Sequence, residues 1–361
     1  MLLISKVSLL KSLPCKKLEI HSAILRLHNF ISQSKFVHSW KVVFYGTDEI
    51  SKVSLEALHL NRMSSDCDRI VNDIDIVCIK SDCPVRQYAT LNNMTVHTWP
   101  YFLPSNMYDV GVVVSFGHMI PSESILACKY GIINAHPSLL PRWRGAAPII
   151  HTILNGDIET GVTITQVSPN KFDVGNILMQ EKYKVPPGCS AKTLTKELSR
   201  ISAHLIMKTL KALPHYIEHS YPQTKDGATL ARKIKPHQGS IDWAKESSLH
   251  IYRKYKAFNG FFDIYTFWTD KKIILLEFLE PQEVENAKIQ SLIKYPISPG
   301  FCYFHKKRKI LFVKCQDGWC GILSVKVPKR GKISAQDFYN GFISKMEPSH
   351  SYFHANDNKS I

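Results

Sequence analysis

The stretch Gly131-Ile132-Ile133-Asn134-Ala135-His136-Pro137-Ser138-Leu139-Leu140-Pro141-Arg142-Trp143-Arg144-Gly145-Ala146-Ala147-Pro148 decides how this chain is interpreted. It opens as a short apolar strand, turns through prolines and ends in small residues before Ile149-Ile150, which is typical of a loop that enters a packed helix. Because side chains alternate along a strand, Asn134 and His136 share one face at the carboxyl end of this strand. The pair is therefore placed to point at one reacting atom.

An amide beside an imidazole suits acyl-group chemistry. Asn donates hydrogen bonds to a developing oxyanion without changing its own charge, and His gives or takes a proton near neutral pH. A carboxylate is still needed to orient the imidazole or collect a proton, and Asp173 is the best candidate because it follows the β-rich run 161–167. Taken singly, each of the three residues has an ordinary structural explanation, as a loop histidine, a turn asparagine and a capping aspartate. As a set beside a proline- and arginine-rich loop, they predict a catalytic site.

Two motifs in this region resemble those of a known family. The run 134–141 resembles the signature of the 10-formyltetrahydrofolate-dependent formyltransferases, and Asp173-Val174-Gly175 with Ile177-Leu178 is similar to the second signature of that family. The continuation 142–148 resembles the branch that acts on methionyl-tRNA. The resemblance extends from Lys41 to about Ile343. It implies that Asn134, His136 and Asp173 are catalytic and that the formyl donor is 10-formyltetrahydrofolate.

The opening of the chain after residue 40 predicts the fold class. Residues 41–45 form an apolar run, Gly46 gives a turn, and a helix is expected through Leu60. Further buried strands are expected at 74–79, 95–97 and 110–115, and continuous apolar runs of this kind are typical of parallel strands. We therefore expect a doubly wound, mostly parallel, Rossmann-like α/β sheet. A single Gly46 falls far short of a dinucleotide fingerprint, so NAD is not proposed.

In open α/β sheets, ligands bind beyond the carboxyl ends of the strands at the point where the strand order reverses. Phe116-Gly117 and the 134–148 loop are expected at such a crevice. The resemblance places folate there, against Phe116 and Gly117 and along the segment Ser138, Leu139, Leu140 and Pro141. His118 is interpreted as a surface or pocket-wall residue.

A second domain is expected after a helix at 193–213. The domains predicted are a transit peptide at 1–40, a catalytic domain at 41–213, a linker at 214–227, a second domain at 228–345 and a tail at 346–361. Short β-like runs at 263–268, 272–278, 300–305, 310–314 and 321–327 predict a small barrel. The resemblance implies that this barrel is OB-like.

The net charge of +16 is concentrated at the two ends of the chain. Basic residues outnumber acids by six to one in 1–40 and by 23 to 13 in 225–361, but only by 17 to 16 in 41–224. The basic second domain suits binding to a phosphate backbone. We expect Lys306, Lys307, Arg308 and Lys309 to contact tRNA, together with Arg142, Arg144, Lys80 and Arg86. Bacterial relatives insert a long basic loop near 80–86, which is short here, so Lys80 and Arg86 alone are available for that task.

The first 40 residues combine basic residues, serines and unevenly spaced leucines, as a mitochondrial transit peptide does. A disordered basic tail is the alternative. Nine scattered cysteines, none in a Cys-x-x-Cys pair, indicate a reducing compartment and no zinc site. The expected protein is a monomeric, non-membrane enzyme of the mitochondrial matrix. The rival interpretations are a formyl-folate transferase acting on a small amine and an inactive RNA-binding scaffold.

Overall fold

A computed structural model describes residues 39–65, 69–169, 171–293, 296–347 and 350–355. The predicted transit peptide lies outside these residues except for its last two positions. One of them, Trp40, begins the first strand, is 3% exposed, and donates its indole N–H to the carbonyl of Leu210. The first strand therefore includes Trp40, a residue that the expected boundary assigns to the transit peptide.

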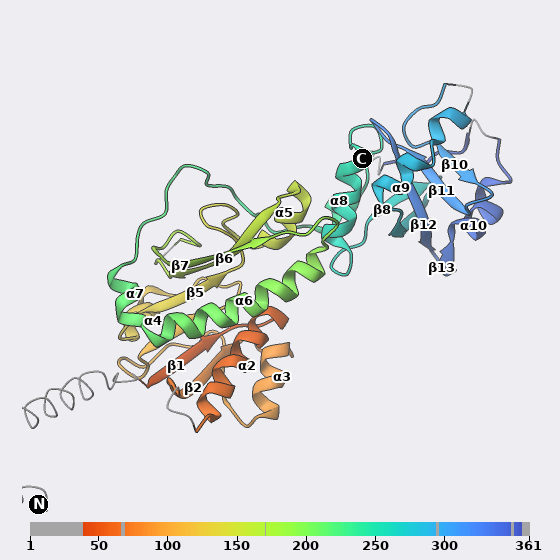
Figure 1. Ribbon diagram of the computed structural model, residues 1–361. Helices are drawn as coiled ribbons and strands as arrows, with labels where there is room; N and C mark the ends of the chain where they lie inside the picture. Colours follow the sequence, from red (N-terminus) through yellow and green to blue (C-terminus); the bar gives the residue numbers. More distant parts are fainter. Residues whose placement is uncertain (1–38, 66–68, 170, 294–295, 348–349, 356–361) are drawn as a thin grey trace, which may run out of the picture.

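The first domain is a seven-stranded sheet in the order β3-β2-β1-β4-β5-β6-β7 (Figure 1). The first five strands in this order are parallel, and β6 and β7 are antiparallel. The strands are β1 (Trp40–Tyr45), β2 (Val71–Cys78), β3 (Thr95–Thr98), β4 (Val110–Val113), β5 (Ile132–His136), β6 (Glu159–Gln166) and β7 (Ile177–Lys184). The mostly parallel Rossmann-like sheet is confirmed, and its order reverses between β1 and β4.

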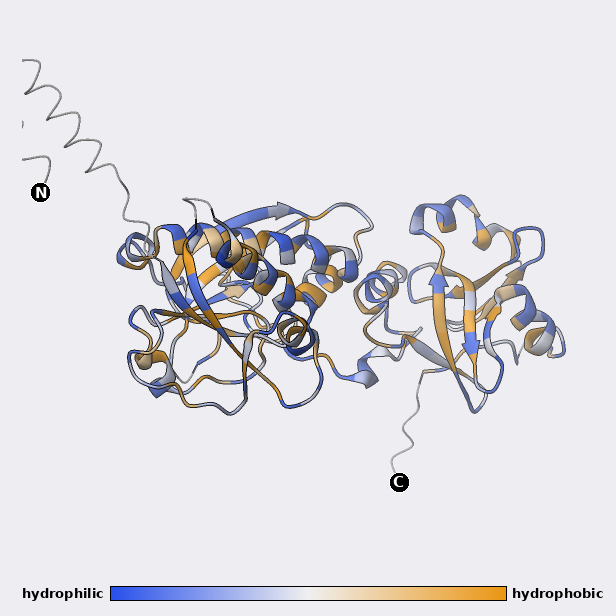
Figure 2. Ribbon diagram, turned by 90° about the horizontal axis from the view of Figure 1, so that it is seen from below, coloured by the Kyte–Doolittle hydropathy of each residue, from blue (hydrophilic) through white to orange (hydrophobic). Residues whose placement is uncertain are grey.

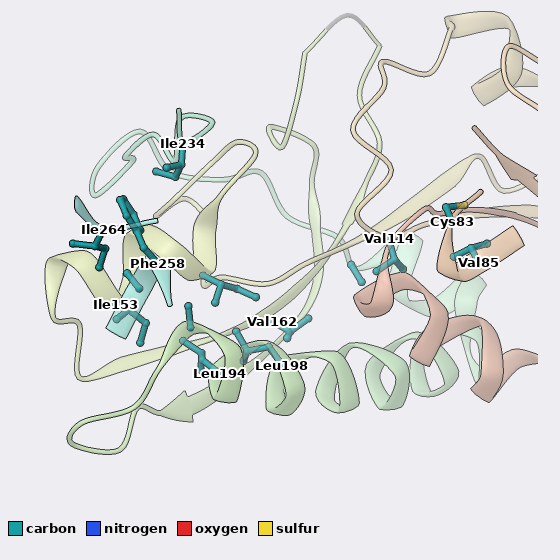
Figure 3. Close-up of a cluster of buried hydrophobic side chains, with 14 of the residues drawn as sticks. Cys83, Val85, Val114, Ile153, Val162, Leu194, Leu198, Ile234, Phe258 and Ile264 are labelled. Carbon is teal, nitrogen blue, oxygen red and sulfur yellow. The ribbon is translucent and has the colours of Figure 1, made fainter. Parts of the chain in front are cut away.

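Helices cover this sheet because each carries an apolar stripe at helical spacing. They are α2 (Glu49–Met63), α3 (Pro84–Leu91), α4 (Ser122–Ala127), α5 (Pro148–Asn155) and α6 (Ala191–Lys211). Asp48 and Ser51 cap α2 reciprocally, and Ser190 caps α6. Leu194 and Leu198 lie on the buried face of α6 toward Val162 of β6 (Figure 3). The helix predicted at 193–213 thus packs against the antiparallel half of the sheet.

The expected linker is partly helical. Helix α7 (Leu213–Glu218) occupies its first third, followed by an extended segment that leads to η1 (Pro236–Gly239) and α8 (Ser248–Phe258). The linker interpretation rested on Pro214, Pro222 and Gly227. The first of these sits in the first turn of α7, where proline is tolerated. The extended part runs back along the first domain before it reaches the second.

The second domain is an antiparallel sheet that curls into a half-barrel, in the order β10-β11-β12-β9-β8 with β13 beside β12. Its strands are β8 (Tyr265–Trp268), β9 (Lys271–Phe278), β10 (Cys302–His305), β11 (Ile310–Lys314), β12 (Trp319–Val327) and β13 (Gly331–Ser334). The short helices α9 (Pro281–Asn286), η2 (Ile289–Leu292), α10 (Ala335–Phe338) and η3 (Tyr339–Ile343) complete it. Strand β13 was not predicted, because its four residues, Gly-Lys-Ile-Ser, contain one apolar side chain and so show no alternation.

The expected tail belongs to this domain. Backbone bridges join His354 to Phe267 in β8 and Tyr352 to Phe301 next to β10, so residues 351–354 connect the two edges of the curled sheet. Phe353, 2% exposed, packs among Trp243, Trp268 and Phe338. The tail interpretation was therefore wrong for this segment, which fills the core and covers edges that a sheet would otherwise leave open.

The two domains form separate lobes (Figures 1 and 2), and they share an apolar contact. Ile153 of α5 lies beside Phe258 of α8 and Ile264, and all three are at most 5% exposed (Figure 3). Ile234, 4% exposed, completes the contact. A single buried cluster therefore runs from the first sheet into the second domain.

Replacing Phe353 with Ala should destabilise the second domain by about 3–5 kcal/mol, because it leaves a cavity among three aromatic rings. Urea unfolding followed by the fluorescence of Trp243 and Trp268 measures the change. Met346→Ala, at a position that is 36% exposed, serves as the control. A loss below about 1 kcal/mol for Phe353→Ala would show that the domain does not depend on this segment.

Candidate active site

The end of β5 places two polar side chains on one face of the sheet. Asn134 is paired with Val113 of β4 and with Thr165 of β6, and His136 follows two residues later on the same face. His136 is 4% exposed, whereas Asn134 is half-buried. The amide is thus the more accessible of the two groups. This position beside β4 adjoins the reversal of strand order, where ligands of such sheets bind.

Asp173 comes from the loop between β6 and β7 and meets both side chains. Its Oδ1 lies 3.2 Å from Asn134 Nδ2, which donates to it, and 3.5 Å from His136 Nδ1. Its Oδ2 accepts the backbone N–H of Gly145 at 2.9 Å. The side chain of Asp173 is 11% exposed. The structure therefore brings the three predicted residues together around one largely buried carboxylate.

The orientation of His136 is set from its other nitrogen. Nε2 lies 2.9 Å from the carbonyl oxygen of Trp143, and a carbonyl only accepts, so Nε2 carries a proton and donates it. Nδ1 then faces Asp173 at a distance suited to an ion pair when the ring is doubly protonated. The imidazole is held on both sides, and this fixes the plane of the ring.

Two residues of the loop after β5 adopt the left-handed backbone region to make these contacts. Trp143 has φ of 63° and Gly145 has φ of 120°. A Cβ atom at Gly145 would lie 2.7 Å from the carbonyl oxygen of Ala231, which is too close for any side chain. Only glycine fits there, and its N–H is the donor that holds Asp173.

A second carboxylate braces the same loop. Asp157 accepts two hydrogen bonds from Arg142, at 2.7 and 2.9 Å, and one from the indole of Trp143 at 2.7 Å. The guanidinium also lies over the Trp143 ring, 4.4 Å from its centroid. Burial alone would raise the pKa of Asp157, but the hydrogen bonds from Arg142, Asn155 and Trp143 outweigh it and lower that pKa. The carboxylate therefore stays charged and anchors the Trp143 carbonyl that holds His136.

Most residues of the segment expected to bind folate are buried or hydrogen-bonded within the chain. Ser138 is fully buried, and its hydroxyl donates to the carbonyl of Arg142. Leu140 is 3% exposed, and its backbone N–H and C=O bond to Thr163 and Gln180. The Pro141 carbonyl accepts from Thr229, whereas Leu139 is half-buried. The side chains of Ser138 and Leu140 are therefore buried within the loop.

The other two residues expected to bind folate follow β4. Phe116 is 4% exposed and packs edge-on against Tyr45, Trp99 and His118, while Gly117 is exposed with φ of 75°. Tyr45 next to Phe116 is fully buried, and this burial, with neighbouring Cys128 and Tyr101, raises the pKa of its hydroxyl. His118 is exposed, as expected. Gly117 thus follows directly after an aromatic cluster formed by Phe116, Tyr45 and Trp99.

The cations of the first domain that were expected to bind tRNA are mostly engaged within the chain. Arg142 is bound to Asp157, and Arg144 donates twice to Gln223. Arg86 donates to the carbonyl of Ile79 and to Thr98. Lys80 is exposed. In the second domain, Lys306, Lys307, Arg308 and Lys309 form the exposed turn between β10 and β11.

Several groups of the site were not predicted. They are the Gly145 amide, the Trp143 carbonyl, Asp157 and Gln223. Asp157 and Gln223 act on residues 14 to 79 positions away in sequence, and no short-range pattern signals such contacts. The unusual Trp143-Arg144-Gly145 run was the one available signal for the two backbone groups.

The comparisons with known proteins agree with this geometry. Residues 103–210 match the family model "Formyl transferase", and residues 233–343 match "Formyl transferase, C-terminal domain". The chain therefore belongs to the formyl transferase family. It is 40% identical to the human mitochondrial methionyl-tRNA formyltransferase, over 87% of this chain and 82% of that protein. The corresponding cattle protein is 39% identical over the same shares.

Solved structures show the same fold at low sequence identity. An N-formyltransferase from Helicobacter canadensis, in complex with folinic acid and dTDP-3-aminofucose, superposes with a TM-score of 0.55 at 18% identity and covers 78% of this chain and 98% of that chain. HypX from Aquifex aeolicus, in complex with tetrahydrofolic acid, gives a TM-score of 0.51 at 14% identity, over 84% of this chain and 47% of that one. Both of these proteins hold folate derivatives.

Within the described ranges, His, Cys, Asp and Glu side chains do not gather in groups of three or more that are arranged to hold a metal ion. None of the helices in the part of the chain that the structure describes is both long and apolar enough to cross a membrane.

Asn134→Ala and Asp173→Ala should each lower formyl-transfer turnover at least about a hundredfold, because each removes a group at the centre of the hydrogen-bonded cluster. The KM for the folate donor should change much less, since these groups act on the reacting atoms. Steady-state kinetics measure both constants. Turnover near the wild-type value in either variant would remove that residue from the catalytic set.

Proposed function

We propose that this protein transfers the formyl group of 10-formyltetrahydrofolate to the α-amino group of methionyl-tRNA. The proposed enzyme acts as a monomer in the mitochondrial matrix, at the start of mitochondrial translation. The observation that carries the proposal is the Asn134–His136–Asp173 cluster, found in a chain that is 40% identical to a mitochondrial methionyl-tRNA formyltransferase over most of both chains.

The reaction begins when the α-amino nitrogen of methionine attacks the formyl carbon. A bond forms between nitrogen and carbon, and negative charge develops on the formyl oxygen. Asn134 donates one amide N–H to Asp173, which leaves the second N–H for this oxygen. A fixed neutral donor of this kind stabilises the tetrahedral intermediate without reorganising.

His136 and Asp173 manage charge and protons in this scheme. As an imidazolium, His136 adds positive charge beside the developing oxyanion and supplies a proton to the departing folate nitrogen. Asp173 keeps the ring oriented through the contact with Nδ1 and accepts the proton that the attacking amine loses, directly or through water. The carbon–nitrogen bond to the folate then breaks and leaves formyl-methionyl-tRNA.

The strand register of the second domain supports its role in tRNA binding. The β10–β11 turn, residues 306–309, lies at the same end of the sheet as the last residues of β12 because Leu311 pairs with Ile322 in antiparallel fashion. Lys326 pairs with Ile274, so the start of β9 lies at this end too. The exposed cations gathered there are Lys271, Lys272, Lys306, Lys307, Arg308, Lys309, Lys326, Lys329, Arg330 and Lys332.

Aromatic groups accompany these cations. Lys272 lies 3.8 Å from the centroid of the Tyr265 ring, and Arg330 lies 5.2 Å from that of Phe342. A hollow of about 490 Å³ beside the β10–β11 turn is lined by Tyr303, His305, Lys306 and Tyr339, among others. Cations interleaved with aromatic rings suit a nucleic acid, which offers both phosphates and bases. If the substrate were a small amine, the exposed cations of this domain would have no phosphate backbone to bind.

The direct test is formyl transfer from 10-formyltetrahydrofolate by residues 39–361, assayed with methionyl-tRNA, free methionine and uncharged tRNA. Only the charged tRNA should be formylated, because the reacting amine and the polyanion must be present in one molecule. Transfer to free methionine at a similar rate would favour a small-amine enzyme. Absence of transfer with tRNA binding retained would favour an RNA-binding scaffold.

Neutralising Lys306, Lys307, Arg308 and Lys309 to Gln should raise the KM for methionyl-tRNA and reduce the slope of affinity against salt, because fewer counterions are released on binding. The control replaces four cations of α6, namely Lys192, Lys196, Arg200 and Lys208, with Gln, which changes the net charge equally. Equal effects of both sets would indicate a non-specific charge effect. An unchanged KM for the first set would remove this turn from the tRNA site.

A further inference from the structure

The extended segment between the two domains lies against both loops of the active site. We call residues 221–231 the strap. Tyr221 pairs with Ile177 at the start of β7, close after Asp173. At the other end, the strap residue Leu230 bridges to Arg144 in the loop after β5. The strap therefore touches the segments that carry Asp173 and Gly145.

Gln223 makes four hydrogen bonds from this position. Its Nε2 donates to the carbonyl oxygens of Asp173 and Gly175, each at 2.9 Å. Its Oε1 accepts from Nε and Nη2 of Arg144 at 2.9 and 2.7 Å. Only one orientation of the amide matches two acceptors on one side and a guanidinium on the other, so its donors and acceptors are unambiguous. Every neighbour of Gln223 from Tyr221 to Ala228 is exposed, whereas Gln223 is half-buried.

These contacts close a ring around the catalytic carboxylate. Gln223 holds the backbone of Asp173, which has φ of 53° in the left-handed region that residues other than glycine adopt in only a few per cent of cases. Gln223 also holds Arg144, and the next residue, Gly145, donates its N–H to the Asp173 carboxylate. Asp173 is thus fixed from its backbone and from its side chain by groups that Gln223 links together.

We propose that Gln223 is a positioning residue for the reaction: it fixes the aim of the Asp173 carboxylate by joining the Asp173 backbone to the loop of Arg144 and Gly145. This inference rests on the proposed formyl transfer. Gln223 does not touch the three catalytic side chains by hydrogen bonds of its own side chain. It acts on Asp173 through the main chain.

Gln223→Glu is the sharpest variant. It keeps the size of the side chain and an acceptor for Arg144 but replaces the donating nitrogen with an oxygen that faces two carbonyl oxygens. We expect kcat to fall about 10- to 100-fold, as for an active-site group displaced by about 1 Å, while the KM for methionyl-tRNA stays within about threefold. Thr224→Ala is the matched control, because Thr224 is exposed and bonds only within the strap, to Asp226.

A double-variant cycle separates positioning from general destabilisation. If Gln223 acts through Asp173, adding Gln223→Glu to Asp173→Ala lowers kcat no further than Asp173→Ala alone. A structural role would instead multiply the two losses. Multiplied losses, or a Gln223→Glu variant with the kcat of the wild type, would overturn the inference.

A readout independent of activity distinguishes failure of this inference from failure of the proposed function. In protein labelled with ¹⁵N-histidine, Gln223→Glu should move the ring-nitrogen resonances of His136, because Nδ1 faces Asp173, and Thr224→Ala should leave them in place. If the His136 resonances do not move in Gln223→Glu, the proposal that Gln223 positions Asp173 is contradicted. A wild-type protein that fails to formylate methionyl-tRNA while these resonances still move would refute the substrate and retain the positioning.

Discussion

The loops of the candidate site depend on the contacts that surround the carboxylate of Asp173. It is largely buried, and a buried charge is tolerated only when donors surround it. The donors come from separate parts of the chain, namely the amide of Asn134 at the end of β5 and the N–H of Gly145 in the following loop. The ring of His136 adds a contact that becomes an ion pair when the ring is doubly protonated. The need to satisfy this carboxylate therefore fixes the conformation of other segments. For example, the residue that donates its N–H must be glycine, because position 145 lies against the carbonyl of Ala231.

Support for this carboxylate comes from residues that never touch it with their side chains. Asp157 braces the loop through Arg142 and Trp143, and Trp143 in turn presents its carbonyl to His136. Gln223 secures the opposite side. A hydrogen-bonded network inside a protein is rigid when every member is satisfied, because no member gains by moving. The geometry of the proposed catalytic cluster is thus maintained by two layers of polar contacts on an apolar sheet.

Local patterns in the sequence predicted the parts of the molecule that depend on local physics. Alternation placed Asn134 and His136 on one face, apolar runs located β1, β2 and β4, and the spacing of leucines located α6 to within two residues at each end. Asp173 was expected as the carboxylate of the set, but its position after β6 does not by itself bring it to Asn134, because β6 runs antiparallel to β5. The loop between β6 and β7 returns Asp173 to Asn134.

Contacts between distant segments were beyond such patterns. The loop arginines, Arg142 and Arg144, are recognisable as cations, but their partners Asp157 and Gln223 are chosen by the fold. Likewise, residues 351–354 have no strong strand pattern and are ordered because two sheet edges offer unpaired backbone groups to them. For the same reason, a polar sequence such as β13 becomes a strand once β12 provides a partner.

The distribution of charge follows from the different demands of the two domains. In the first domain, Arg142, Arg144 and Arg86 are engaged by internal acceptors, so the site presents fixed dipoles where charge develops during the reaction. A surplus of free cations there would hold a polyanion in many orientations. The second domain instead gathers exposed lysines at one end of its sheet, where the strand register brings three separate turns together. The cations suited to attract a polyanion over a distance thus lie in the second domain, and the polar groups proposed to act in the reaction lie in the first. Each set can be strong without disturbing the other.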